Sequence, residues 1–240
     1  VDCINPESIY SVADFYKSSL ELITEIHNKN KLPLFVGGSM MYFKSLINGL
    51  DNLPERDDQY RSELQNIKNK NGVELLHKML KELDPNYAKR VNVFDEKRII
   101  RALEVCIMTG ESFSSQRKSG EPIFDILQVG IDAPKELLYD RISVRVDEMI
   151  AGGLVEEIEK LLKQKYSWQL PSMSGIGYRQ FQKYFINEQS LEETVELLKR
   201  DTRRFARRQK TWFKRDTRIN WCENFEQVNT FVGQFLKNKQ

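Results

Sequence analysis

The sequence predicts an α/β protein built on a parallel sheet, with a helical insertion and additional helices toward its carboxy-terminal end. The first sign is a short apolar run, Leu32–Val36, which lies between two helical patterns and ends at Gly37 and Gly38. Such runs are typical of buried strands in parallel sheets. A second apolar run, Ile126–Ile131, ends at Asp132. Only helical periodicity separates the two runs, so two predicted strands flank a helical insertion.

The other elements follow from apolar spacing and turn residues. A helix is expected over residues 11–28 with Ser11 as its cap, and a second over residues 41–50. Asp95 is a possible cap within the insertion. Helices are also expected over residues 135–165, interrupted at Gly152 and Gly153, over about 175–186 and over 190–214, while the tail after Gly233 is expected to fray.

These elements divide the chain into part of an α/β core (1–55), a helical insertion domain (56–120), and a core strand followed by carboxy-terminal helices (121–240). Two strands are too few for a stable open sheet. The pattern therefore leads us to expect further strands before Val1.

Composition excludes several classes of protein. No apolar run approaches the roughly 18 residues of a membrane-spanning helix. The three cysteines lie far apart without a CxxC pair, so neither a disulfide framework nor a zinc site is predicted, and a reducing cytoplasm is the expected compartment. The two histidines, His27 and His77, have no cysteine or carboxylate cluster beside them, and the sequence predicts neither a protein metal cage nor a nucleophilic triad.

Positive charge is concentrated near the carboxy-terminal end of the chain. The net charge is only +2, yet residues 199–218 contain ten lysines and arginines against two aspartates. A solvated helix face is the ordinary alternative. So many cations would repel one another without an anionic partner, and we therefore favour binding of nucleic acid.

Arg141 and Arg145 lie four residues apart on the predicted helix 135–165, so their guanidinium groups project from one face. Paired guanidinium groups suit the bidentate binding of a pyrophosphate. Arg145 is the stronger candidate because it lies beside the apolar stripe of Ile142 and Val146. The alternative is that both arginines are simply solvated.

Three further segments combine residue types that bind phosphates or bases. Gly37, Gly38 and Ser39 follow the first predicted strand, where ligands of parallel sheets bind, although two glycines could serve only a tight turn. Lys97, Arg98 and Arg101 could contact phosphate or could form ion pairs with Glu96 and Glu104. The stretch 174–180 brings together two glycines, a tyrosine, an arginine and a glutamine, which could stack on a base or bind its edge, or could be a turn with a core ring.

Taken in order, these segments resemble the tRNA dimethylallyltransferase family over nearly the whole chain. The resemblance rests on Tyr10–Phe15, on Val36–Ser39 with Tyr42, and on Arg98–Val105. It continues through Arg141–Met149, Gly153–Glu157, Ile176–Arg179 and Thr202–Trp212. Seven such blocks in the family's order make coincidence improbable.

The resemblance implies a P-loop NTPase-like parallel sheet with a helical insertion domain, working as a cytoplasmic, monomeric prenyltransferase. The implied reaction moves a dimethylallyl group from dimethylallyl pyrophosphate to N6 of the adenosine 3′ of the anticodon, with Mg²⁺ assisting the leaving group. It implies that Arg145 is catalytic and that Gly37, Gly38, Ser39 and Arg141 lie on the pyrophosphate side. The residues implied to contact the anticodon stem-loop of tRNA are Lys97, Arg98, Arg101, Ser174, Gly175, Ile176, Gly177, Tyr178, Arg179, Arg203, Arg207, Arg208, Gln209, Lys210, Thr211, Trp212 and Lys214.

The chain departs from the family in one respect. No GxxxxGK[ST] phosphate loop occurs in the 240 residues, and the aspartate that the family uses as base toward N6 is expected before Val1. Asp2 is not taken as that base. Two alternatives therefore stay open: a catalytically inactive RNA-binding fragment, and an enzyme acting on free adenine nucleotides, which the insertion and the basic helix disfavour.

Overall fold

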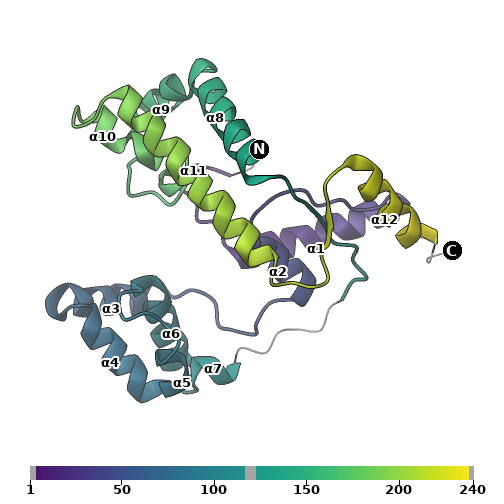
Figure 1. Cartoon of the computed structure of the whole chain (residues 1–240). Coiled ribbons are helices and arrows are strands. Elements are labelled where there is room, and N and C mark those ends of the chain that lie inside the picture. Colours follow the sequence, from purple (N-terminus) through teal and green to yellow (C-terminus); the bar gives the residue numbers. More distant parts are fainter. Residues whose placement is uncertain (1–3, 117–122, 238–240) are drawn as a thin grey trace. The chain divides into compact units, whose positions relative to one another are not determined.

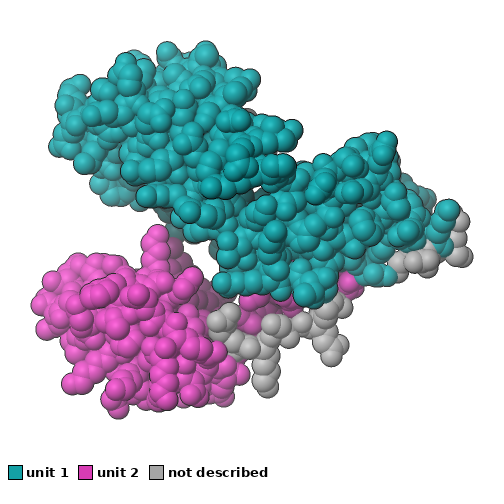
Figure 2. Space-filling model, viewed as in Figure 1, with its two compact units in different colours: residues 1–43, 125–240 teal, residues 44–124 magenta. Residues whose placement is uncertain are grey.

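The computed structural model describes residues 4–116 and 123–237. It divides into two compact units (Figure 2). The main unit comprises residues 1–43 and 125–240, and the insertion unit comprises residues 44–124. The insertion predicted for residues 56–120 lies within the insertion unit, which begins earlier, inside helix α2 (Met40–Asn48).

Every regular element among the described residues of the insertion unit is a helix (Figure 1). Its elements are α3 (Asp58–Asn71), α4 (Val73–Leu83), α5 (Pro85–Ala88), α6 (Glu96–Thr109) and α7 (Phe113–Gln116). Aspartates begin three of these helices: Asp57, Asp84 and Asp95 each accept a hydrogen bond from a backbone N–H of the first turn. The predicted cap at Asp95 is therefore confirmed.

One apolar core holds the insertion unit together. The apolar face of α4 contributes Leu76 and Leu80, and α6 contributes Ile99 and Leu103, all with no exposed surface. Leu64 of α3 and Phe113 of α7 complete the same cluster. Apolar residues recur at helical spacing on both α4 and α6, which is why these segments form helices that pack against each other.

The main unit contains a small parallel sheet. Strand β1 (Val129–Ile131) confirms the last part of the apolar run predicted as a strand, and it pairs with β2 (Asn220–Cys222), which was not predicted. Gly130 lies opposite Trp221. A Cβ atom at Gly130 would lie 2.8 Å from the Trp221 ring, so the close approach of this ring requires glycine.

The prediction of a buried strand at Leu32–Val36 is wrong. The segment is not in a strand, and Leu34 and Val36 are 83% and 87% exposed. Pro33 has no N–H to donate to a neighbouring strand, and the described residues supply no partner strand for this segment. Apolar composition alone therefore did not produce a paired strand here.

The remaining helices belong to the main unit. They are α1 (Val12–Asn28), α8 (Lys135–Ala151), α9 (Leu154–Lys163), α10 (Gln182–Phe185), α11 (Leu191–Phe213) and α12 (Phe225–Lys237), with short 3-10 turns at Ser172–Ser174 and Arg179–Phe181. The cap at Ser11 and the break at Gly152 and Gly153 are confirmed. The single helix predicted over 175–186 is wrong, because Gly177 has a φ of 109° and only short turns and α10 form there. Helix α12 continues through the predicted fraying point to Lys237.

Helices α8, α9 and α11 pack around a second apolar core in the main unit. Val146 of α8, Ile158 of α9 and Leu198 of α11 are buried in it with Met173 and Phe181. This core fixes the side of α11 that faces inward, and hence the side that stays in solvent. Among the described residues, none of the helices combines the length and the apolar character that crossing a membrane requires.

Candidate functional site

The carboxy-terminal half of α11 contacts the segment that carries Gly37, Gly38 and Ser39. The Gln209 side chain donates a hydrogen bond from Nε2 to the Gly38 carbonyl at 2.8 Å. One turn later, Phe213 packs edge to face on Phe43, with ring centroids 5.9 Å apart. The turn predicted to bind pyrophosphate is therefore attached to the basic helix.

The same half of α11 is attached to the end of β1. Asp132 follows β1 directly, and its carboxylate accepts from Lys210 Nζ at 2.5 Å and lies 3.6 Å from Lys214 Nζ. The hydrogen bond from Lys210 holds the pKa of Asp132 below its usual value. Lys214 also lies over the Trp221 ring of β2, 5.9 Å from its centroid. Both lysines thus have protein partners at the carboxyl end of the sheet.

Earlier turns of α11 contact α8. Arg203 Nη2 donates to Ser143 Oγ at 2.7 Å, and its guanidinium lies 5.6 Å from the centre of the Tyr139 ring. Lys199 Nζ pairs with Asp147 at 2.8 Å, and the hydrogen bond with Asp147 raises the pKa of Lys199. These contacts fix the rotation of α8 about its axis, and with it the direction of Arg141 and Arg145.

Asp201 of α11 joins the segment 174–180 to the helix. Its carboxylate accepts from Gln180 Nε2 at 3.0 Å and lies 3.5 Å from Arg179 Nη2. Burial alone would raise the pKa of Asp201, but the Gln180 hydrogen bond and the neighbouring arginines outweigh burial and lower it. The buried Gln180 also accepts from the Gly177 N–H at 3.1 Å.

The rest of this segment divides between core and surface. Ser174 and Gly175 are exposed, whereas Ile176 and Tyr178 pack against the α8–α9–α11 core. The Tyr178 hydroxyl donates to Glu157 of α9, and this hydrogen bond raises the pKa of Tyr178 to about 12. The segment therefore presents its first residues and Arg179 to solvent while its tyrosine hydroxyl is already bonded.

A second group of predicted residues stays in solvent. Arg141 and Arg145 are exposed on α8, and Arg207 is exposed on α11; none of the three makes an ion pair with another described residue. Arg208 and Thr211 are also exposed on α11, and the Arg208 guanidinium lies over the Phe205 ring. Trp212, half-buried, packs edge to face on Phe213. These exposed guanidinium groups are available to an anionic ligand.

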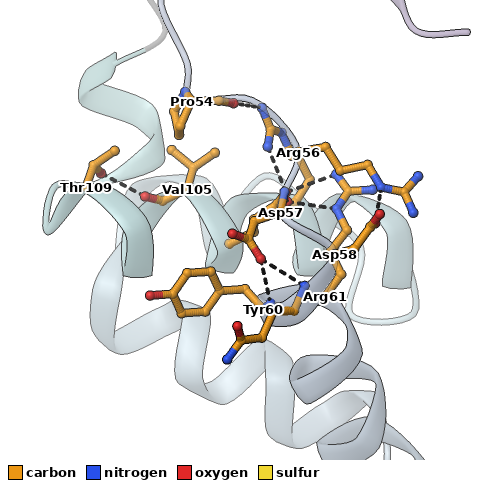
Figure 3. Close-up of polar contacts among 11 residues, drawn as sticks. Pro54, Arg56, Asp57, Asp58, Tyr60, Arg61, Val105 and Thr109 are labelled. Atoms are coloured by element: carbon orange, nitrogen blue, oxygen red, sulfur yellow. Dashed lines mark hydrogen bonds and ion pairs between the residues drawn. The ribbon is translucent and has the colours of Figure 1, made fainter. Parts of the chain in front are cut away.

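One predicted residue of the insertion unit, Arg101, is paired with a buried carboxylate. Glu104 has no exposed surface and accepts from Arg61 Nε and Nη2, each at 2.9 Å, and from Arg101 Nη1 at 2.7 Å. Arg101 also donates to the Pro54 carbonyl at 2.7 Å, and the Asp57 N–H donates to Glu104. Figure 3 draws polar contacts of this region, with Pro54, Asp57 and Arg61 labelled.

Burial alone would raise the pKa of Glu104, but the hydrogen bonds from Arg61, Arg101 and the Asp57 N–H outweigh burial and lower it. The guanidinium of Arg101 thus has a structural role in the insertion unit. Lys97 and Arg98 are exposed at the start of α6, and Arg98 lies 3.4 Å from Asp95.

The described residues contain no group of three or more histidines, cysteines or acids that could hold a metal ion. The acid at the end of β1, Asp132, is already paired with two lysines. The side chains of the described residues therefore do not form a protein cage for Mg²⁺.

Sequence reasoning missed three residues that organise the site: Asp132, Ser143 and Asp201. Asp132 carried a usable signal, because an acid at the carboxyl end of a parallel strand lies where site residues gather. Ser143 and Asp201 stood within helical patterns and gave no signal of their own. Their roles depend on which face of each helix meets its neighbour.

Comparison with known proteins agrees with this arrangement. The model of the family described as IPP transferase matches residues 1–216, which is most of the chain. The chain belongs to the IPP transferase family. The match includes the Gly37–Ser39 turn, the arginines of α8 and the basic helix α11.

Individual members of the family match almost the entire chain. It is 40% identical over 241 residues to a tRNA dimethylallyltransferase of Geobacter sulfurreducens, covering 98% of this chain and 78% of that protein. It is 38% identical over 244 residues to one of Moorella thermoacetica, covering 98% and 75%. A solved tRNA isopentenylpyrophosphate transferase of Bacillus halodurans is 33% identical with a TM-score of 0.68, covering 100% of this chain and 77% of that one. The chain is thus a mostly helical α/β member of the family with a small parallel sheet.

Proposed function

We propose that this protein transfers a dimethylallyl group from dimethylallyl pyrophosphate to N6 of the adenosine 3′ of the anticodon in tRNA. The observation that carries the proposal is the family match over residues 1–216, with curated relatives named tRNA dimethylallyltransferase. Those names favour a transferase over an inactive RNA-binding fragment and favour tRNA over a free nucleotide as acceptor.

In the proposed reaction, N6 of adenosine attacks C1 of the dimethylallyl group, the C1–O bond breaks, and pyrophosphate leaves with the bonding electrons. N6 loses one proton to a base, a role that the resemblance assigns to an aspartate of the family. Negative charge therefore builds on the departing pyrophosphate. The exposed guanidinium of Arg145, which is engaged by no described acid, suits the stabilisation of that charge, with Arg141 one turn away on α8.

The RNA is proposed to bind the outward side of α11. Arg207 and Arg208 are exposed there, so they can neutralise phosphates without losing a protein ion pair. Ser174 and Gly175 are exposed on the neighbouring segment, and Lys97 and Arg98 on the insertion unit. Adenosine N6 lies inside the base stack of RNA, so the base would be turned out to react.

Three further parts of the proposal rest on the family resemblance. The parallel pair β1–β2 would belong to a P-loop-type core. The chain spans 75–78% of the length of these curated relatives. Mg²⁺ would be held mainly by the donor's own pyrophosphate oxygens. The protein would act in the cytoplasm as a monomer.

The catalytic part of the proposal is tested by comparing two arginines of one helix. Arg145→Ala in the complete protein is expected to lower the rate of transfer to an unmodified anticodon stem-loop by about 100-fold, the effect typical of losing one group that stabilises developing charge. Arg141→Ala, which removes an equally exposed arginine, is expected to have a much smaller effect. Equal effects of the two substitutions would contradict the role of Arg145. Transfer to free AMP at the same rate would contradict tRNA as the acceptor.

The RNA-binding part is tested by charge reversal on α11. The double variant Arg207→Glu, Arg208→Glu is expected to weaken tRNA binding and to reduce the slope of log K against log salt by roughly 0.7–0.9 for each lost phosphate contact. The control is Lys17→Glu, Lys160→Glu, which makes the same change in net charge at two exposed lysines without ion pairs to described residues. An equal loss of binding in both double variants would show that net charge, and not α11, determines affinity.

A further inference from the structure

The side chain of Gln209 points inward, toward the turn that precedes α2. Its Nε2 atom donates to the Gly38 carbonyl at 2.8 Å across a separation of 171 residues. A Cβ atom at residue 38 would lie 2.2 Å from the same Nε2 atom. Real Cβ contacts are never that short, so any larger residue at position 38 would displace the Gln209 amide from this hydrogen bond.

Two neighbouring contacts hold the same junction. Phe213, four residues after Gln209, packs on Phe43, so two consecutive turns of α11 contact the segment 38–43. Lys210 and Lys214, also four residues apart, both reach Asp132 at the end of β1. This end of α11 therefore contacts the segment 38–43 through Gln209 and Phe213, and the end of β1 through Lys210 and Lys214. Arg207 and Arg208 of the same helix stay exposed.

The hydrogen bond fixes the orientation of the peptide between Gly38 and Ser39. The described peptide bonds are trans, so the carbonyl of Gly38 and the N–H of Ser39 point in opposite directions. Because Gln209 holds the carbonyl toward α11, the Ser39 N–H points away from α11. Among the described residues this N–H donates to no protein group. It is thus available to an anion on the side of the turn opposite to α11.

We infer that Gln209 is a positioning residue for the dimethylallyl pyrophosphate donor, which it serves by orienting the Gly38–Ser39 peptide, and that it couples this turn to the RNA-binding helix. The inference rests on the proposed function. The resemblance implied that Gln209 contacts tRNA, but its amide is bonded to the Gly38 carbonyl, so we give it a role distinct from that of Arg207 and Arg208, which face solvent on the same helix. Loss of the Gln209 hydrogen bond should therefore change donor binding while leaving RNA binding intact.

The test measures steady-state transfer by the complete protein, with the concentrations of donor and stem-loop varied separately. Gln209→Met keeps the length of the side chain and removes the donating amide without adding a charge to α11. We expect the KM for dimethylallyl pyrophosphate to rise by about 10-fold, the effect of losing one part-buried hydrogen bond, with the Kd for the stem-loop unchanged. Gln234→Met, at an exposed glutamine of α12, makes the same chemical change and is expected to behave as wild type.

A pair of small substitutions separates positioning from a general loss of stability. Gly38→Ala alone should raise the donor KM about as far as Gln209→Ala does, because its Cβ atom displaces the Gln209 amide from the hydrogen bond. The double variant should therefore show the donor KM of Gln209→Ala alone. Additive defects in the double variant would overturn the inference. A higher Kd for the stem-loop with an unchanged donor KM in Gln209→Met would also overturn it. Absence of transfer by the wild-type protein would instead overturn the proposed function, and the inference with it.

Discussion

The two units bury similar apolar sequences in different ways. In the insertion unit, the leucines of α4 and α6 meet one another, and Leu76, Leu80 and Leu103 have no exposed surface. In the main unit, the apolar run that resembles a buried strand leaves Leu34 and Val36 more than four-fifths exposed. An apolar pattern predicts that a segment suits burial, but it does not supply the partner that buries it. The insertion unit contains both partners within about 60 residues, whereas the main unit is assembled from distant segments.

The largest expected effect is on the free energy of unfolding, when leucine is replaced by alanine at one site in each unit. Leu80→Ala should lower the free energy of unfolding of the insertion unit by about 2–5 kcal/mol, because it leaves a cavity in a closed core. Leu34→Ala removes the same atoms from an 83% exposed side chain and should change stability by less than about 0.5 kcal/mol. Amide hydrogen exchange measures the stability of the two units separately. A large loss of stability in Leu34→Ala would break the comparison, because it would show that residues 32–36 are covered in the complete protein.

The next effect concerns the buried carboxylate of the insertion unit. Glu104→Gln should destabilise this unit by about 2–3 kcal/mol at neutral pH, because Arg61 and Arg101 lose a charged acceptor while the neutral amide keeps part of their hydrogen bonding. Denaturant unfolding followed by circular dichroism measures the change. Glu82→Gln, at an exposed glutamate with no ion pair to a described residue, is the control.

The difference in stability between wild type and Glu104→Gln should depend on pH in a definite direction. The pKa of Glu104 in the folded protein lies below its ordinary value of 4.5. Its contribution to stability is therefore complete above pH 4.5 and is lost as the pH falls through the lower folded pKa. Glutamine does not titrate, so the gap between wild type and Glu104→Gln should narrow at acid pH. A gap that stays constant down to the acid unfolding transition would show that the charge of Glu104 is not what stabilises the unit.

Sequence reasoning predicted the helices well because their signals are local. Ser11, Asp95 and the pair Gly152 and Gly153 mark helix ends through contacts within one turn, and each prediction is confirmed. Strand β2 gave no such signal. Its three residues become a strand because Asn220–Cys222 pairs with Val129–Ile131, about 90 residues earlier. Local pattern cannot reveal a pairing that depends on the path of the whole chain.

The candidate site shows the same limit. Charge density predicted that α11 is the basic element, but not which cations face solvent. Lys210 and Lys214 meet Asp132, and Arg203 meets Ser143, whereas Arg207 has no partner among the described residues. Only the packing of α11 against α8 and the sheet determines which of these cations have protein partners and which face solvent. The resemblance to a family located the functional segments, and the contacts assign each side chain a direction.

The smallest predicted effect lies in the main unit and sharpens the comparison of the two units. Ser190 begins α11 in a capping box with Glu193, and Ser190→Ala should cost about 1 kcal/mol of stability. All three tryptophans, Trp168, Trp212 and Trp221, belong to the main unit, so tryptophan fluorescence during urea unfolding reports on this unit alone. Ser18→Ala, at a helical serine whose hydroxyl bonds to no described group, is the control. If the cap variant lowers the fluorescence midpoint and leaves amide protection in α4 and α6 unchanged, the units unfold independently. An equal loss of protection in α4 and α6 would mean that the insertion unit depends on the main unit for its stability, despite its closed core.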